Sequence, residues 1–564
     1  MYFFEHIHTT IDINIYEQPF QSVLYSVIGP GLWYTYKRRV HMRRLLNAKQ
    51  MRACDSYTSD YFGVEPVVLM ERAALSTYIS ICNCGKMYLE SRVLIICGTG
   101  NNGADGLALT RILYESGHNA EYCIPFDSGK HSELFDRQKS ILEKYGQFAK
   151  GIDDIRDEYD IVIDAMFGIG LSRDLSADIK VFIEKINQLD GFKVAMDIPS
   201  GVNADNGRVM GCAFRADITV TYGFAKPGLV LYPGKDFCGE VLISNIGITG
   251  NSLECLDEEI DPHPVYFMEQ EDLLTFLPER PDDGNKGTFG KVLIYAGSDE
   301  ISGACVLSSL AALKSGAGMV KVITSKENAE VLKNTVPEAM VTCIGDGLNE
   351  KLDTDLNWAD VVMAGPGIGT GEGAAEVLSD LLIKAPDKPF VIDADGINLI
   401  AGNDRLKDMI KERKAVTVLT PHMGELSRLS GKPVEELKEN VLSHATPFAS
   451  DLGVILVAKD AVTSVTNGKD VVLVHSGNNG MATAGSGDVL AGIISSMLAN
   501  KAFEREGITQ MAAVLCGVYL HGMAGSECLQ DMAEDSVTAG DIIISLQRVL
   551  KTLRDEQKTG KINE

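Results

Sequence analysis

Residues 92–103 read RVLIICGTGNNG, an apolar run followed directly by a glycine-rich turn. Apolar residues with helical spacing then continue from Leu107 to Leu113. A strand, a GxGxxG turn and a helix in this order are typical of a parallel α/β sheet, in which the turn can present backbone N–H groups to a phosphate. The same glycines also suit a purely structural tight turn. The stretch therefore predicts the fold more firmly than it predicts a ligand.

The same alternation of strands and helices extends in both directions from this turn. Such alternation favours parallel sheets covered by helices on both faces. Between residues 250 and 287 acidic residues and prolines cluster, as in a linker. We predict two α/β domains: a Rossmann-like three-layer domain over residues 42–255 and a second three-layer domain over residues 256–555. Residues 1–41 form an atypical extension, with Met42 as an alternative start, and residues 556–564 form a polar tail. A mostly helical segment is predicted from Met42 through Cys84. The strands are predicted at residues 92–97, 160–164, 193–197, 217–221, 240–243, 292–295, 319–323, 361–363, 390–392, 416–419, 454–457 and 471–474.

Composition excludes several classes of function. The 564 residues include 52 Lys+Arg and 78 Asp+Glu, a net charge of −26, so general binding to nucleic acid or to an anionic membrane is disfavoured. No apolar run is long enough for a transmembrane helix. The modest apolar stretch 23–36 is followed by positive charge rather than preceded by it, unlike a secretory signal. The 12 cysteines are scattered, which favours reduced thiols and the cytoplasm.

In the first half, polar side chains follow several predicted strands. Oxygen donors at Asn102, Asp164 and Ser200 come at three strand ends, which meet at one edge of a parallel sheet. This set suits a hard cation, and the lack of His or Cys argues against zinc. Asp197 also follows a strand, and Lys226 could neutralise a phosphate or move a proton. Each alone would also fit a helix cap or a solvated surface residue.

These turns, NNGADG at 101–106, the Gly168-Ile169-Gly170 turn after Asp164 and DIPSG at 197–201, resemble those of the NAD(P)H-hydrate epimerases over about residues 42–250. The resemblance implies potassium bound by Asn102, Asp164 and Ser200. It implies that Asp197 is the first candidate for acid/base catalysis at the epimerised carbon and that Lys226 is the second. The implied substrate-binding residues are Asn101, Asn102, Gly103, Ala104, Asp105, Gly168, Ile169, Gly170, Leu171, Ser172, Arg173, Asp174 and Asp197.

The sharpest motif in the chain is AGSGDVLAG at residues 484–492. A glycine-rich turn opening a helix forms an anion site from backbone N–H groups. Asp488 at its end can take a proton from an attacking hydroxyl during phosphoryl transfer. An Asp helix cap is the structural alternative. His422 could be a turn residue whose ring nitrogens are hydrogen-bonded within the protein, and Lys459 could be an ordinary solvated lysine. Both follow predicted strands, however, and this position favours a role facing a ligand.

The second half resembles the ribokinase-like superfamily, and within it the ADP/ATP-dependent NAD(P)H-hydrate dehydratases, over about residues 265–550. The likeness rests on TPHMGE at 420–425, GPGIG at 365–369 and GNNGMATAGSGD at 477–488. Asn479 and residues 484–486 depart from the usual family pattern while keeping small or polar character. By this likeness the hydrated nucleotide would contact Ala304, Gly367, His422 and Asp488, and the adenine nucleotide Lys459, Asp460, Ala461, Val462, Thr463 and Gly487.

Together the resemblances imply a bifunctional NAD(P)H-hydrate repair enzyme, an isomerase joined to a lyase. The epimerase would interconvert R- and S-NADHX or NADPHX. The dehydratase would convert the S form to NAD(P)H with ADP, escorted by magnesium, giving AMP and phosphate. A homo-oligomer is expected. The alternatives are a ribokinase-like small-molecule kinase with a nucleotide-binding regulatory domain, and a non-enzymatic cofactor-binding protein, which conflicts with Asp488 on its glycine turn. The residues leave open the ADP or ATP donor, the NADHX or NADPHX preference and the group that moves the proton in epimerisation.

Overall fold

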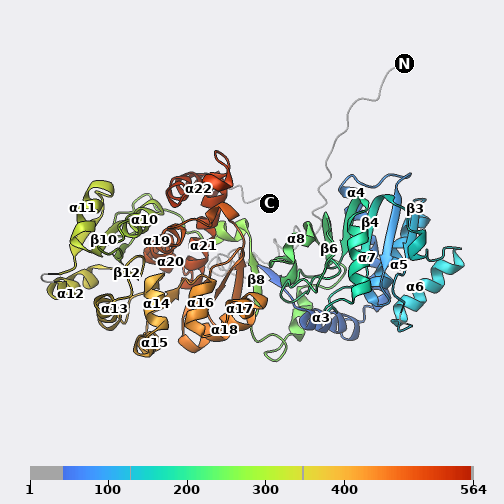
Figure 1. The fold of residues 1–564 in the computed structure, drawn as a ribbon, viewed down its shortest axis with the longest axis horizontal. Coiled ribbons are helices and arrows are strands. Elements are labelled where there is room, and N and C mark those ends of the chain that lie inside the picture. The colour runs from blue at the N-terminus through green and yellow to red at the C-terminus, as the bar shows by residue number, and fades with distance from the viewer. Residues whose placement is uncertain (1–41, 128, 346–347, 560–564) are drawn as a thin grey trace, which may run out of the picture. The chain divides into compact units, whose positions relative to one another are not determined.

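The computed structural model describes residues 42–127, 129–345 and 348–559. The predicted extension 1–41 and residues 560–564 of the predicted tail lie outside this range. Two β-sheets, each covered by helices, make up most of the described chain (Figure 1). No helix in these described segments is long and apolar enough to cross a membrane.

The first sheet has six strands in the order β3-β2-β4-β5-β6-β7, and every neighbouring pair is parallel. Because the order reverses between β2 and β4, the loops after these two strands diverge and leave a crevice at the carboxyl edge of the sheet. The strands are β2 (Arg92–Cys97), β3 (Asn119–Cys123), β4 (Glu158–Ala165), β5 (Asp190–Met196), β6 (Ile218–Tyr222) and β7 (Glu240–Ser244).

Helices cover both faces of this sheet, which confirms the predicted three-layer arrangement. Alternate residues of β2 enter the two layers: Ile95 packs with α3, α4 and α5, whereas Ile96 packs with α7. This alternation is the period of a strand buried on both sides. The helices are α3 (Ala48–Asp60), α4 (Pro66–Asn83), α5 (Asn101–Glu115), α6 (Glu133–Lys144) and α7 (Ala177–Asn187).

The glycine-rich turn after β2 is needed for packing. A Cβ atom on Gly98 would lie 2.0 Å from the carbonyl oxygen of Met166, and one on Gly103 would lie 1.7 Å from that of Gly98. Glycine therefore lets α5 begin directly against the ends of β2 and β4. These glycines have a structural reason even without a ligand.

The second sheet has eleven strands in the order β1-β8-β17-β16-β15-β14-β13-β12-β9-β10-β11. Its centre, from β11 to β15, is parallel, whereas β16 is antiparallel to both its neighbours and β1 is antiparallel to β8. The strands are β1 (Arg43–Leu45), β8 (Val265–Met268), β9 (Lys291–Tyr295), β10 (Met319–Thr324), β11 (Met340–Cys343), β12 (Val361–Ala364), β13 (Phe390–Ile392), β14 (Thr417–Leu419), β15 (Ile455–Ala458), β16 (Thr463–Thr466) and β17 (Val471–Val474).

Helices again lie on both faces of this sheet (Figure 1). One layer contains α10 (Gly303–Lys314), α19 (Ser486–Ala499), α20 (Lys501–Arg505), α21 (Gln510–Cys528) and α22 (Ala539–Thr559). The opposite layer forms one large apolar core with the sheet. It contains α12 (Leu348–Trp358), α13 (Glu372–Lys384), α14 (Asp395–Ala401), α15 (Asp404–Lys411), α16 (Met423–Ser430), α17 (Val434–Glu439) and α18 (Val441–Leu452). The remaining α-helices are the short α8 (Lys235–Cys238), α9 (Gln270–Phe276) and α11 (Lys326–Thr335).

Two local predictions differ from the structure. The helical pattern expected from Met42 begins only at α3, because residues 43–45 form β1, whose Arg44 guanidinium donates to the carbonyl of Val265 at 2.8 Å. Three residues are too few to show a strand period. At the other end, α22 continues to Thr559, into the segment predicted as a polar tail.

Candidate functional sites

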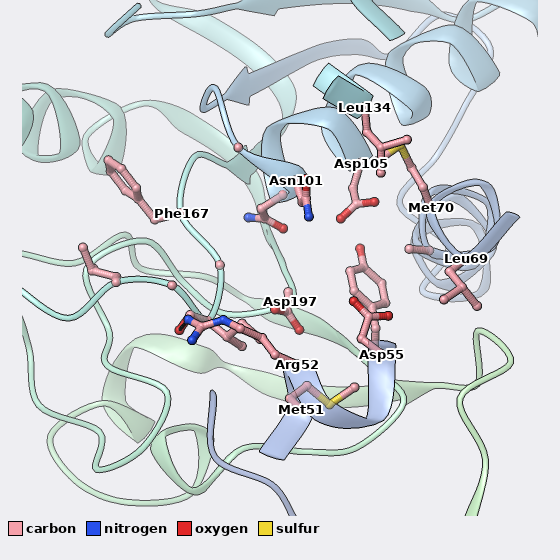
Figure 2. Close-up of a pocket in the computed structure, with 18 of the residues that line it drawn as sticks. Met51, Arg52, Asp55, Leu69, Met70, Asn101, Asp105, Leu134, Phe167 and Asp197 are labelled. Carbon is pink, nitrogen blue, oxygen red and sulfur yellow. Dashed lines mark hydrogen bonds between the residues drawn. The ribbon is translucent and has the colours of Figure 1, made fainter. Parts of the chain in front are cut away.

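A cavity of about 590 Å³ opens at the carboxyl edge of the six-stranded sheet. Its walls come from the turns after β2, β4 and β5, and from helices α3 and α4 (Figure 2). Most of the residues predicted for this site line it: Asn101, Asn102, Asp105, Gly168, Ile169, Gly170, Leu171, Ser172, Arg173, Asp197 and Lys226. Five do not. Gly103 and Ala104 are buried within α5, Asp164 and Ser200 are fully buried, and Asp174 forms a 3.5 Å ion pair with Arg208.

A buried ion pair lies at the floor of this cavity. Lys226 is 1% exposed, and its Nζ donates to Asp197 Oδ1 at 2.5 Å and to Thr221 Oγ1 at 2.8 Å. Asp197 has a φ of 67°, a left-handed conformation that costs free energy in a residue other than glycine. The fold thus holds a charged lysine and a strained carboxylate together, which fits a site for proton transfer.

Two further carboxyl groups face the cavity without such a partner. Asp105 in α5 and Asp55 in α3 make no hydrogen bond or ion pair with another described residue, and Figure 2 shows both beside Asp197. Burial, followed by the negative charge of Asp197, raises the pKa of both carboxyl groups. Burial and the charge of Asp105 also raise the pKa of Tyr222, which lines the same cavity. The cavity therefore holds carboxyl groups that retain protons more readily than Asp residues in water.

The three residues predicted to hold a cation adjoin the same turns. Asp164 is fully buried; its Oδ1 accepts from Ser200 Oγ at 2.7 Å and its Oδ2 accepts from the Ser200 amide at 2.7 Å. Burial raises the pKa of Asp164 to about 6. Both polar atoms of the Asn102 side chain are buried and have no hydrogen-bond partner among the described residues. A buried amide without a hydrogen-bond partner is a costly arrangement unless a ligand completes it.

Sequence reasoning missed part of this cavity. Asp55, Arg52, Leu69 and Met70 line it from α3 and α4, and Tyr222 lines it from β6. Tyr222 directly follows the predicted strand 217–221 and is the last residue of β6, but its apolar surroundings gave no sign of a site. The four helical residues belong to no glycine-rich turn and follow no strand. Only the packing of α3 and α4 over the sheet edge brings those four side chains to the cavity.

A second group of charges surrounds the N-terminus of α19. Gly485 caps this helix with a φ of 85°, and Asp488 lies in its first turn. Burial, followed by the charge of Asp393, raises the pKa of Asp488 to about 7, while Lys459 opposes the shift. A carboxyl group with a pKa near neutrality is well suited to act as a general base.

Strand ends supply the charges around Asp488. Lys459 follows β15 and its Nζ donates to Asp393 Oδ1, at the end of β13, at 2.8 Å. A Cβ atom on Gly487 would lie 3.3 Å from both Asp393 Oδ2 and Lys459 Nζ, so the glycine turn sits directly against this ion pair. Gly487, Lys459 and Asp488 are thereby brought together as the sequence predicted.

The other residues predicted for the second site lie at the same sheet edge but differ in surroundings. Ala304 contacts the turn at Gly367, where a Cβ atom would lie 3.0 Å from that of Ala304. His422 caps α16, its Nδ1 accepting from the amide of Gly424 at 3.0 Å, and its side chain is 56% exposed. Val462 is buried in an apolar cluster with Leu45. His422 thus has a structural role, and its Nε2 lies 3.5 Å from Glu425 Oε1 while more than half of its side chain stays exposed.

Two family models match the chain, one in each half. Residues 66–228 match the model described as YjeF-related protein N-terminus, and residues 292–548 match the model described as NAD(P)H-hydrate dehydratase. These ranges contain the first cavity's turns and the α19 turn, respectively.

Curated relatives match nearly the whole chain. The bifunctional NAD(P)H-hydrate repair enzyme of Thermofilum pendens is 33% identical over 530 residues, covering 91% of this chain and 97% of the relative. The chain belongs to this family of bifunctional NAD(P)H-hydrate repair enzymes. The Moorella thermoacetica enzyme is 32% identical, and the match covers 91% of this chain and 98% of the relative. The Escherichia coli enzyme is 30% identical, and the match covers 89% of this chain and 93% of the relative. Among solved structures, the Bacillus subtilis ADP/ATP-dependent NAD(P)H-hydrate dehydratase, crystallised with ATP and Mg²⁺, is 29% identical over 51% of this chain and 98% of its own, with a TM-score of 0.44.

Membership in the NAD(P)H-hydrate repair family confirms the predicted enzyme class and its two activities. The order of the halves is that of an epimerase followed by a dehydratase. The ion pair Asp197–Lys226 belongs to the first half and the ion pair Asp393–Lys459 to the second. Each half of the family fold therefore contains its own charged site at the carboxyl edge of its own sheet.

Proposed function

We propose that the cavity of the six-stranded sheet is the NAD(P)H-hydrate epimerase site and that the α19 turn is the dehydratase site, which uses ADP. The observation that carries this proposal is Asp488, a carboxyl group with a pKa of about 7 at the end of an anion-binding turn. Hydroxide is a poor leaving group. A base that lets the hydroxyl of the hydrate attack a phosphoryl group turns it into phosphate, a good leaving group.

In the dehydratase, the turn 485–487 would receive the transferring phosphoryl group on its backbone N–H groups. Lys459, 20% exposed as a side chain and paired with Asp393, would face the nucleotide phosphates. Electron donation from the ring nitrogen would then expel phosphate and restore the dihydronicotinamide, leaving AMP. Among the described residues no group of three or more acidic, His or Cys side chains could hold a metal alone. Magnesium would therefore arrive bound to the nucleotide phosphates.

In the epimerase, the 590 Å³ cavity is within the usual range for a small-molecule site. Asn101 and the turn 168–174 would hold the hydrated nucleotide, and Asp197 with Lys226 would face the carbon that changes configuration. The residues present fit a potassium ion, because the amide oxygen of Asn102 is buried without a partner, and Asp164 and Ser200 supply further buried oxygens at neighbouring strand ends. A cation there would neutralise Asp164 and hold the turns after β2, β4 and β5 together.

We also place the enzyme in the cytoplasm. All 12 cysteines are free thiols, and five of them are at least partly exposed to solvent. Free, accessible thiols are typical of proteins in a reducing compartment, which supports this location.

The test uses purified protein and a mixture of both NADHX epimers, with ADP or ATP and in potassium or sodium buffer. We expect NADH absorbance to recover from both epimers with ADP, and the R epimer to disappear more slowly in sodium. Accumulation of a stable phosphorylated product would instead indicate a small-molecule kinase. Equal epimerisation rates in both salts would remove the potassium site from the proposal.

A further inference from the structure

Asp55 is a carboxyl group in the epimerase cavity for which the fold has no structural use. It lies on α3, whose Met51, Cys54 and Thr58 are buried, and it lines the cavity instead of the core. Its carboxyl group has no hydrogen bond or ion pair with any residue that the structure describes. In Figure 2 it approaches the cavity beside Asp197, from a different wall.

The helix that carries Asp55 is held firmly in place. Asn47 caps α3 through a reciprocal pair of hydrogen bonds with Gln50, each at 2.9 Å. The amide of Ala48 donates to Asp205 Oδ1 at 2.6 Å, and Gln50 Nε2 donates to Asp261 Oδ1 at 2.7 Å. Asp55 is therefore presented to the cavity by a fixed element, as expected for a group that acts on a bound substrate.

The two carboxyl groups differ in their partners. Asp197 is paired with Nζ of the buried Lys226 at 2.5 Å. Asp55 has no such partner and is reached by solvent at the cavity; desolvation by its surroundings and the neighbouring Asp197 raise its pKa, while Lys226 lowers it in part. Two carboxyl groups in surroundings this different suit an acid and a base at one site.

Epimerisation of a hydrate needs such a pair. The hydroxyl leaves one face of the ring carbon and water adds to the other, so one group must supply a proton and another must accept one. We propose that Asp55 is the second proton-transferring residue of the epimerase, working opposite Asp197 in each turnover; this rests on the proposed assignment of the cavity to epimerisation.

The step balances without a co-reactant. Protonated Asp55 gives its proton to the hydroxyl, the C–O bond breaks, water departs, and the lone pair of the ring nitrogen forms a C=N⁺ bond. A water molecule then attacks the other face of this carbon: its electron pair forms the new C–O bond, the C=N π electrons return to the nitrogen as its lone pair, and the extra proton goes to the Asp197 carboxylate. Proton exchange with solvent returns Asp55 to its protonated form and Asp197 to its carboxylate form before the next turnover. In the reverse direction the two residues exchange roles.

The first experiment compares Asp55→Asn with Asp60→Asn, a carboxylate on the same helix that does not line the cavity, in the full-length protein. Using R-NADHX, we expect Asp55→Asn to lower kcat for epimerisation about 100-fold or more with KM unchanged, and Asp60→Asn to leave both unchanged. Dehydration of the S epimer with ADP should be normal in both variants, which shows that each is folded. Asp55→Glu should recover part of kcat.

Three results would overturn the assignment of Asp55: kcat of Asp55→Asn within threefold of the unmodified enzyme, a rise in KM at unchanged kcat, or a loss of dehydration equal to the loss of epimerisation. If the unmodified enzyme itself fails to epimerise, the proposed function of the cavity fails first. A second measurement runs R-NADHX in H₂¹⁸O, corrected for the reaction without enzyme. We expect one ¹⁸O in each S-NADHX formed, whereas retention of ¹⁶O would exclude the hydroxyl departure in which Asp55 acts.

Discussion

The two halves of the chain place similar charges at the carboxyl edges of unrelated sheets. Each has a lysine paired with an aspartate at a strand end, Lys226 with Asp197 at 2.5 Å and Lys459 with Asp393 at 2.8 Å. Among the described residues other than glycine, positive φ angles occur at Asp197 itself and at Ala394, directly after Asp393. Strained backbone is therefore confined to the two strand ends that carry these ion pairs.

The difference between the halves lies in the carboxyl groups around each pair. In the first half Asp55 and Asp105 line a cavity that opens to solvent, so carboxyl groups lie on more than one of its walls. In the second half Asp488 lies at the opening of α19, next to a turn shaped for an anion. In the proposed roles, the Asp197–Lys226 pair takes part in reversible proton transfer, whereas the Asp393–Lys459 pair lies near a single base for phosphoryl transfer.

The largest expected effect separates the two sites completely. Asp488→Asn removes the base while keeping the shape of the side chain, so dehydration should fall about 10²- to 10⁴-fold. Epimerisation should be unchanged because the first cavity does not include this residue. The measurement is the initial rate of NADH recovery with ADP beside the rate of epimer exchange without nucleotide; dehydration at more than a tenth of the normal rate would contradict the assignment.

The ion pairs themselves should differ in their contribution to stability. Lys226→Met leaves Asp197 without its buried partner and should lower the free energy of unfolding by about 3 kcal/mol. Lys459→Met should cost less, about 1–2 kcal/mol, because the Lys459 side chain is 20% exposed against 1% for Lys226. Urea unfolding of both variants measures the two losses of unfolding free energy. Equal losses would contradict the expected larger effect of Lys226→Met.

The pH dependence sharpens the comparison further. Asp488 must be ionised to act as a base, and its pKa is raised to about 7. Dehydration should therefore fall about tenfold for each pH unit below 7 and level off above it. Because Lys459 lowers the pKa of Asp488, Lys459→Met should move the midpoint to higher pH. A profile with its midpoint near pH 4 would show that Asp488 is not the titrating group.

The smallest effect concerns His422. Its ring nitrogen caps α16, so His422→Ala should lower the free energy of unfolding by about 1 kcal/mol. If the exposed ring also contacts the substrate, KM for S-NADHX should rise as well. His422→Asn, which retains a capping acceptor, should restore stability but not KM. Full recovery of both by Asn would assign His422 to capping alone.

The sequence predicted the central strands of both sheets well because they are apolar runs buried on both faces, as in residues 92–97. It missed β1, β3, β8, β11 and β16, which are short or carry polar residues and so show no clear period. The residues predicted in turns after strands lie near one another, since the carboxyl ends of parallel strands share one edge. Asp55 could not be placed with them from the sequence, because its position in the cavity depends on how α3 packs over that edge.

The most direct test of two cooperating sites in one chain starts from R-NADHX alone, with ADP and potassium. The unmodified enzyme should convert all of it to NADH, with one AMP and one phosphate formed per NADH. Asp488→Asn should stop at a mixture of the R and S epimers with no AMP released. Persistence of the R epimer with the unmodified enzyme, or NADH formation by Asp488→Asn at the normal rate, would contradict this account.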